Sequence, residues 1–137
     1  MVSSVEILDN KINFLISISE KIQEYVDINL DFSTFVINNN LTSTQVVLII
    51  KALTILNYRR QNILNEHINE FKNDLRFKVI LKEEPPTFNE FVEFLKFINL
   101  EVNGEKLLKS LKKQNIGENI CQFLIEDKSN NWYNKLI

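Results

Sequence analysis

The single histidine and the single cysteine are the residues with the most specific chemistry in this chain of 137 residues. His67 lies between Glu66 and Glu70, and an imidazole beside two carboxylates has the donor types of a metal site. Their spacing matches no established ligand set, so we expect an ordinary surface histidine. Cys121 lies on the apolar face of a predicted helix. A thiol in such a position is buried and unreactive unless a base lies beside it. The sequence therefore predicts no metal-binding, cofactor-binding or catalytic residue.

Paired carboxylates offer a second kind of chemistry. Glu83 with Glu84, and Glu90 with Glu93, have the residue types of a general acid and base. Surface carboxylates are far commoner than catalytic ones, and no pocket-forming motif accompanies these pairs. The chain has two glycines, which excludes the glycine-rich loops of dinucleotide and P-loop enzymes. Enzymatic activity is the least favoured function.

Basic side chains gather in two places and could contact phosphate groups. They are Lys106, Lys109, Lys112 and Lys113 in one segment, and Arg59 with Arg60 in another. Sixteen basic residues against eighteen acidic ones give a net charge of −2, so no overall field attracts nucleic acid. Nucleic-acid binding would have to depend on these local patches.

A degenerate winged helix-turn-helix is the DNA-binding fold that the pattern allows. Residues 42–56 would form its recognition helix, and a short strand at 76–81 would form its wing. The would-be recognition helix has one cation, Lys51, and a nearly continuous apolar belt. A helix that reads a DNA groove presents polar side chains instead, so DNA binding is the alternative rather than the leading function.

The elements that must position these residues begin with a long amphipathic helix over residues 4–27. Apolar residues at spacings of three and four mark one face of it, namely Val5, Leu8, Ile12, Leu15, Ile22 and Val26. A second apolar stripe consists of Ile7, Phe14, Ile18 and Tyr25. Two apolar faces need two coverings, which could be the rest of the chain and a second copy. We therefore predict that the first set is a self-association surface, with burial inside its own domain as the alternative.

Capping signals place the following helices. Thr42 with Gln45, and Thr87 with Glu90, have the spacing of capping boxes, and the second follows the pair Pro85 and Pro86. The helix after Thr42 carries the widest apolar belt and should be the most buried. Asp31 could cap a short helix that stops at the asparagines of residues 38–40.

The remaining segments are shorter. Residues 57–75 continue a weak helical pattern, and residues 76–81 form a short strand, a loop or an intermolecular pairing. Two more helices are expected over 105–114 and 118–126, followed by a polar tail over 127–137. The tail carries Trp132 and Tyr133, which either dock on the domain or act as a hook for a partner.

Two segments together, residues 32–53 and 87–125, resemble the YhaI-like family of small helical proteins from bacilli and their phages. In that family a long N-terminal helix is followed by an aromatic turn, a helix start at leucine and Ser/Thr, and a later start at Thr-Phe that leads into two or three short helices. The resemblance implies an all-helical, oligomeric intracellular protein and brings no catalytic residues. Residues 57–84 are longer than the corresponding link of the family.

These observations predict a single all-α domain over residues 1–137. In it a long N-terminal helix over 1–29 packs on a bundle of five or six shorter helices, with one short strand near 76–81 as an option. Cys121 has no partner for an internal disulfide and the longest apolar run, 46–50, is too short to span a membrane, so we expect a cytoplasmic protein. We predict a non-enzymatic homo-oligomer that binds another protein, as a small regulator or a phage-encoded antagonist of a host protein.

Overall fold

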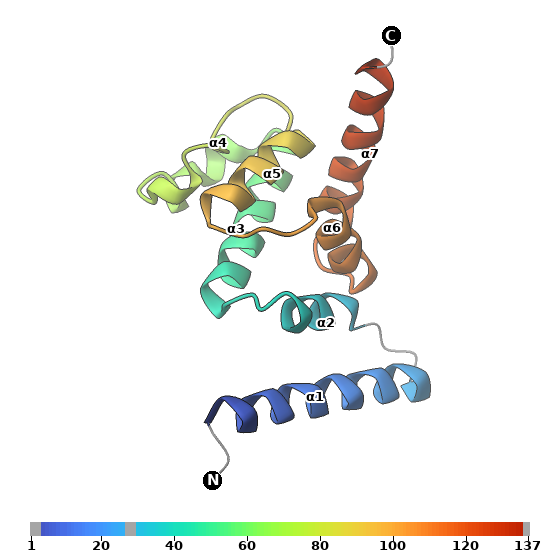
Figure 1. Ribbon diagram of the computed structural model, residues 1–137. Coiled ribbons are helices and arrows are strands. Elements are labelled where there is room, and N and C mark those ends of the chain that lie inside the picture. Colours follow the sequence, from blue (N-terminus) through green and yellow to red (C-terminus); the bar gives the residue numbers. More distant parts are fainter. Residues whose placement is uncertain (1–3, 27–29, 136–137) are drawn as a thin grey trace.

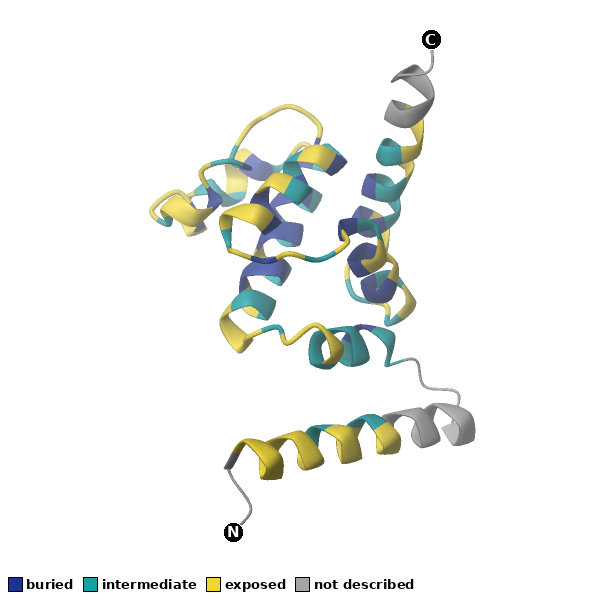
Figure 2. Cartoon of the chain, viewed as in Figure 1, coloured by how far each residue is buried: buried dark blue, intermediate teal, exposed yellow. Residues whose placement is uncertain are grey.

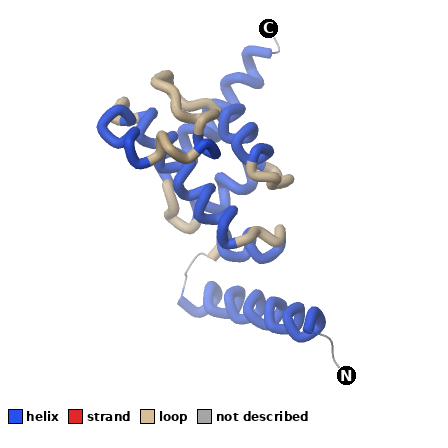
Figure 3. The backbone as a smooth tube through the Cα atoms, turned by 90° about the vertical axis from the view of Figure 1, so that its left-hand side faces the viewer, coloured by secondary structure: helices blue, strands red, loops and turns tan. Residues whose placement is uncertain are grey.

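The computed structural model describes the backbone of residues 4–26 and 30–135 (Figure 1). Side chains are described for residues 5–18 and 30–130. The α-helices are α1 (Ser4–Val26), α2 (Asp31–Asn38), α3 (Ser43–Arg60), α4 (Leu64–His67), α5 (Phe88–Phe97), α6 (Gly104–Lys113) and α7 (Glu118–Lys135). Two short 3-10 helices, η1 (Ile68–Glu70) and η2 (Leu75–Phe77), follow α4. The described part contains helices and loops without a strand, which confirms the all-α prediction (Figure 3).

Helix α3 is the centre of the hydrophobic core. It begins at the predicted capping box, in which Thr42 Oγ1 accepts from the Gln45 amide at 3.1 Å and Gln45 Oε1 accepts from the Thr42 amide at 3.0 Å. Its Ile49 and Leu56 are completely buried, in agreement with the predicted belt. Helices α5 and α7 pack on α3, and α6 packs along α7 (Figure 1).

Helix α2 connects the core to α1. It packs against α6, and Ser33 at its start exchanges hydrogen bonds with Gln114 just beyond the end of α6. Helix α1 packs chiefly against α2 (Figure 2). Large apolar side chains of α1 therefore stay outside the core that the other helices share.

Of the alternatives left open for residues 76–81, the short strand is wrong. The segment is η2 followed by turns, in which the Phe77 carbonyl accepts from the amides of Ile80 and Leu81. Phe77 and Ile80 are buried, and the Phe77 ring stacks on Phe94 with 5.9 Å between centroids. The buried residues thus lie three apart, as in a 3-10 turn, rather than two apart as in a strand.

Two helix boundaries also differ from the prediction. Asp31 is the first residue of α2 and does not cap it, because Leu30 occupies the cap position and the Asp31 carboxylate pairs with Lys113 instead. Helix α7 continues to Lys135, so residues 127–135, which were expected to form a polar tail after a helix over 118–126, are helical. The side chains of Trp132 and Tyr133 lie outside the described residues.

Four helices end in the same way, with an asparagine in the left-handed region. Asn40, Asn62, Asn99 and Asn115 have φ between 55° and 61° and follow α2, α3, α5 and α6. The amide of the next residue reaches back to a carbonyl five residues earlier, as from Leu100 to Leu95 at 2.9 Å. This is the Schellman motif, with asparagine at the position where glycine is usual.

Replacing Asn99 with alanine should lower the free energy of unfolding by about 1 kcal/mol, because alanine gains no local hydrogen bond in the left-handed region. Replacing it with glycine should be neutral or slightly stabilising. Asn89 is exposed within α5, so N89A is the matched control and should change stability little. Urea denaturation followed by circular dichroism measures all three, and an equal cost for N99A and N89A would contradict the prediction.

Candidate functional site

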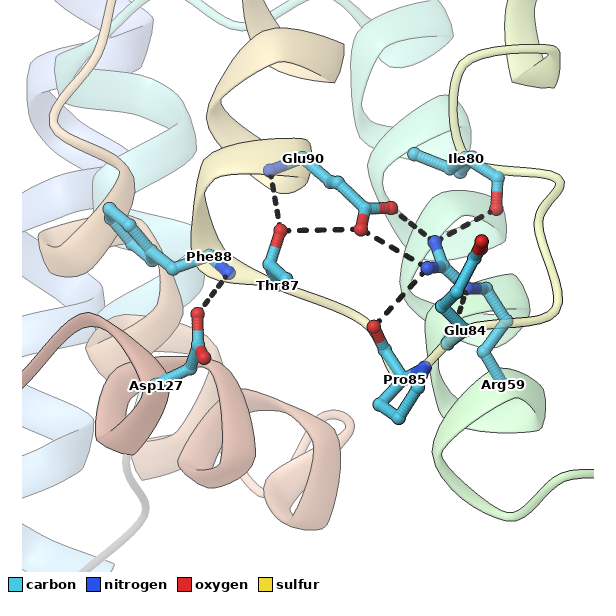
Figure 4. A network of polar contacts seen from close by, with 8 residues as sticks. All are labelled: Arg59, Ile80, Glu84, Pro85, Thr87, Phe88, Glu90 and Asp127. Atoms are coloured by element: carbon cyan, nitrogen blue, oxygen red, sulfur yellow. Dashed lines mark hydrogen bonds and ion pairs between the residues drawn. The ribbon is translucent and has the colours of Figure 1, made fainter. Parts of the chain in front are cut away.

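The best-defined polar site of the structure surrounds the guanidinium of Arg59, which has no exposed side-chain surface. Its Nε donates to the Glu84 carbonyl at 2.9 Å, its Nη1 to the Ile80 carbonyl at 3.1 Å, and its Nη2 to the Pro85 carbonyl at 3.3 Å (Figure 4). The same two terminal nitrogens donate to both carboxylate oxygens of Glu90. All five donors of the guanidinium are therefore used.

This arrangement is structural. Residues 78–87 form an irregular loop, whose carbonyls need donors that a sheet or helix would otherwise supply. Arg59 supplies them from α3 and holds the loop to the start of α5. Thr87 Oγ1 still accepts from the Glu90 amide at 3.2 Å, but the Glu90 carboxylate bonds Arg59 and the Thr87 hydroxyl. The second capping box is thus half formed.

The prediction that Arg59 contacts nucleic acid is wrong, because its guanidinium is buried and fully bonded. Arg60 is half-buried, and its Nε donates to Asn57 at 3.0 Å. The carboxylate pair Glu90 and Glu93 is divided, because Glu90 is held by Arg59 and Glu93 is exposed, whereas Glu83 and Glu84 are both exposed.

A carboxylate from α7 completes the start of α5. Asp127 Oδ2 accepts from the Phe88 amide at 2.9 Å, in addition to the cap that Thr87 provides (Figure 4). Helix N-termini favour negative charge, so this contact stabilises the packing of α5 on α7. The sequence contained no signal for it, because the two residues are 39 positions apart.

His67 is half-buried rather than on an open surface, and Cys121 is buried. The His67 ring stacks on Tyr58 with 4.1 Å between centroids, and its Nδ1 lies 3.6 Å from Glu70 Oε1. Cys121 is buried on α7, and burial raises the pKa of its thiol from 9.0 to about 12. Residues 4–26 and 30–135 bring no three His, Cys, Asp or Glu side chains together in a way that could hold a metal ion.

The Cys121 thiol should resist iodoacetamide in the native protein at a pH near its ordinary pKa of 9.0, because burial suppresses the reactive thiolate. Since the folded pKa lies above the unfolded one, this group's stabilising contribution is complete below about pH 9 and declines toward about pH 12. Mass spectrometry should show labelling only after unfolding in guanidinium chloride. Rapid native labelling would contradict the buried position.

The lysines of α6 line two depressions on the surface. One is a groove of about 470 Å³ between α2 and α6, and it contains Lys106, Lys109 and Lys113. Thr34, Asn38, Asn39 and Ser110 also line it. The other depression lies between α6 and α7, where Lys112 Nζ donates to Gln122 Oε1 at 2.5 Å.

Carboxylates partly neutralise these lysines. Lys109 Nζ lies 3.1 Å from Glu105, and Lys113 Nζ lies 3.5 Å from Asp31. Lys128 also pairs with Glu105, and hydrogen bonds from Lys128 and Lys109 lower the pKa of that carboxyl. No ion pair of Lys106 occurs within the described part of the chain. The structure therefore brings Lys106, Lys109 and Lys113 together in one groove and turns Lys112 toward α7.

The second candidate surface is the outer face of α1. Large apolar side chains that are at least one-third exposed lie along it, namely Ile7, Leu8, Phe14, Leu15 and Ile18. At 100° per residue these five positions span roughly 120° of the helix. Ile12 and Ile16 lie outside this arc and are half-buried. The half-buried stretch of α1 lies on the edge toward α2 (Figure 2).

The described residues among those predicted for self-association therefore divide into three groups. Leu8 and Leu15 belong to the exposed face, Val5 is exposed at the start of the helix, and Ile12 is half-buried. The side chains of Ile22 and Val26 lie outside the described residues. The second apolar stripe contributes more to the exposed face than the sequence pattern indicated.

Within the described ranges, the helices lack the combination of length and apolar character that crossing a bilayer requires. Comparison of the chain with models of known protein families, with curated proteins and with solved structures gave no match. The candidate surfaces are therefore argued from their own geometry.

Proposed function

We propose that this chain is a non-enzymatic association protein, a small regulator that pairs with a second copy through α1 and binds another protein. The observation that carries the proposal is the exposed apolar face of α1. Phe14 is 65% exposed and Leu8 is 56% exposed, although residues of this type are normally buried. A contiguous exposed apolar patch of this kind is typical of a protein interface.

The spacing on this face favours a second copy of the same helix. Ile7 and Phe14 are seven residues apart, as are Leu8 and Leu15, and Ile18 extends the row. A seven-residue apolar repeat is typical of helices that pair along their length. Helix α1 has 23 residues, so it is about 35 Å long and offers more than three heptads. A two-fold pair would match each apolar row with an identical row.

The resemblance of residues 32–53 and 87–125 to YhaI-like proteins supports the same proposal, because it implies an oligomeric helical protein. DNA binding is supported less well. Arg59 is buried, and two of the three lysines in the α2–α6 groove already have carboxylate partners. The basic residues of the two predicted patches that have no carboxylate partner are fewer than the phosphate contacts that DNA-binding proteins usually make.

Light scattering coupled to size exclusion tests the proposal on the full chain. A dimer or larger assembly is expected across micromolar concentrations, and its mass should fall as the protein is diluted. A strictly monomeric protein over the same range would contradict self-association through α1.

A further inference from the structure

We propose that the groove between α2 and α6 binds an acidic, extended segment of a partner protein. This inference rests on the proposed function, since it gives the chemistry of the protein partner. The groove has a volume of about 470 Å³, which lies within the range of sites that bind ligands. Its lining combines three ammonium groups with one carboxylate, Asp31.

The charge of the groove favours an anion. Lys106, Lys109 and Lys113 are exposed on α6, and the Glu105 carboxylate that pairs with Lys109 is shared with Lys128. Lys113 and Asp31 are separated by 3.5 Å at one end of the groove. An incoming carboxylate would therefore meet ammonium groups that are only partly neutralised and still reach solvent.

The spacing of the lysines fits a peptide. Positions 106, 109 and 113 follow one face of α6, and the first and last lie about 10 Å apart along the helix axis. Alternate side chains of an extended chain point the same way and are about 7 Å apart. Two acidic residues separated by one position can thus both reach lysines of this groove.

The other lining groups also suit a polypeptide. Thr34, Asn38 and Asn39 line the α2 side, and their hydroxyl and amide groups can bond a peptide backbone. Phe35 adds a half-buried apolar surface between them. A nucleic-acid backbone would instead need a longer basic stripe, because each contact contributes little and many phosphates must be neutralised.

Fluorescence anisotropy with a fluorescein-labelled peptide of alternating Glu and Ser tests the inference on the full chain. The acidic peptide should bind more tightly than the matching peptide of alternating Gln and Ser, and salt should weaken it. The double variant Lys109→Gln/Lys113→Gln should lose about fivefold in affinity. Lys72 and Lys78 are exposed outside the groove, so Lys72→Gln/Lys78→Gln is the control with the same charge change and should bind as the native chain does.

Three results would contradict the proposal that the groove binds an acidic peptide. They are no binding of the acidic peptide at low salt, equal losses of affinity in both double variants, or tighter binding of a random-sequence DNA duplex. The peptide titration and light scattering on the native chain together separate the two proposals. Acidic-peptide binding by a native chain that is strictly monomeric would support the groove and contradict pairing through α1. Association of the native chain without binding of the acidic peptide would support pairing through α1 and contradict the groove proposal.

Discussion

Replacing Arg59 with methionine should lower the free energy of unfolding by about 3–5 kcal/mol, the range for breaking a buried ion pair from one side. Methionine keeps much of the side-chain length but has no donors. The Glu90 carboxylate and the carbonyls of Ile80, Glu84 and Pro85 would then lose their shared partner. Urea denaturation followed by circular dichroism measures the effect, provided that the slope of the transition is unchanged.

Two further variants distinguish the effect of losing the hydrogen-bond network on stability from the effect of losing one positive charge. Arg60→Met removes the adjacent guanidinium, which is half-buried and bonds Asn57, and should cost less than about 1 kcal/mol. Arg59→Lys keeps the charge but loses the five-donor fork, so an intermediate cost is expected. Equal stability of the Arg59→Met and Arg60→Met variants would contradict a stabilising role of the Arg59 network.

The double variant Leu8→Glu/Leu15→Glu should convert an associated chain into a monomer. Each substitution places a carboxylate on the exposed apolar face of α1, where pairing would bury it without a partner. Both leucines are more than half exposed in the single chain, so the fold itself should be unaffected. Light scattering coupled to size exclusion measures the mass, and circular dichroism confirms that helical content is retained.

The matched control is Asn10→Glu/Ser17→Glu. These two residues are also exposed, seven apart on the same helix, and lie off the apolar face. The control adds the same charge to α1 and should leave the assembly intact. Loss of assembly in both variants would indicate a general charge effect, and loss in neither would show that α1 does not form the interface.

Local signals in the sequence predicted the helices well. The capping box of Thr42 and Gln45 places the start of α3, and the apolar belt that follows identifies it as the buried helix. Both depend on residues close together in the chain. The segment 76–81 left a strand, a loop and an intermolecular pairing open, because Phe77 and Val79 alternate as in a strand. The structure has a 3-10 helix and turns there, with Phe77 stacked on Phe94, a tertiary contact that no local signal indicates.

The sites were harder to predict, because they depend on contacts between distant residues. Arg59 has the charge of a surface cation, and its burial follows from carbonyls 21 to 26 positions later in the chain. Of the α6 lysines that the sequence grouped on one side of a helix, the structure brings Lys106, Lys109 and Lys113 into one groove and turns Lys112 toward α7. Their groove depends on α2, whose packing on α6 follows from contacts between distant residues such as Ser33 and Gln114.

The asparagines that follow four of the helices connect the protein's shape to the codons of its gene. Asparagine and isoleucine codons are rich in A and T, and the chain has nineteen asparagines against two glycines. A lineage with such a base composition can end helices with asparagine, whose side chain tolerates the left-handed region. In a relative from a GC-rich genome, we expect glycine at positions 40, 62, 99 and 115 while the helices keep their lengths.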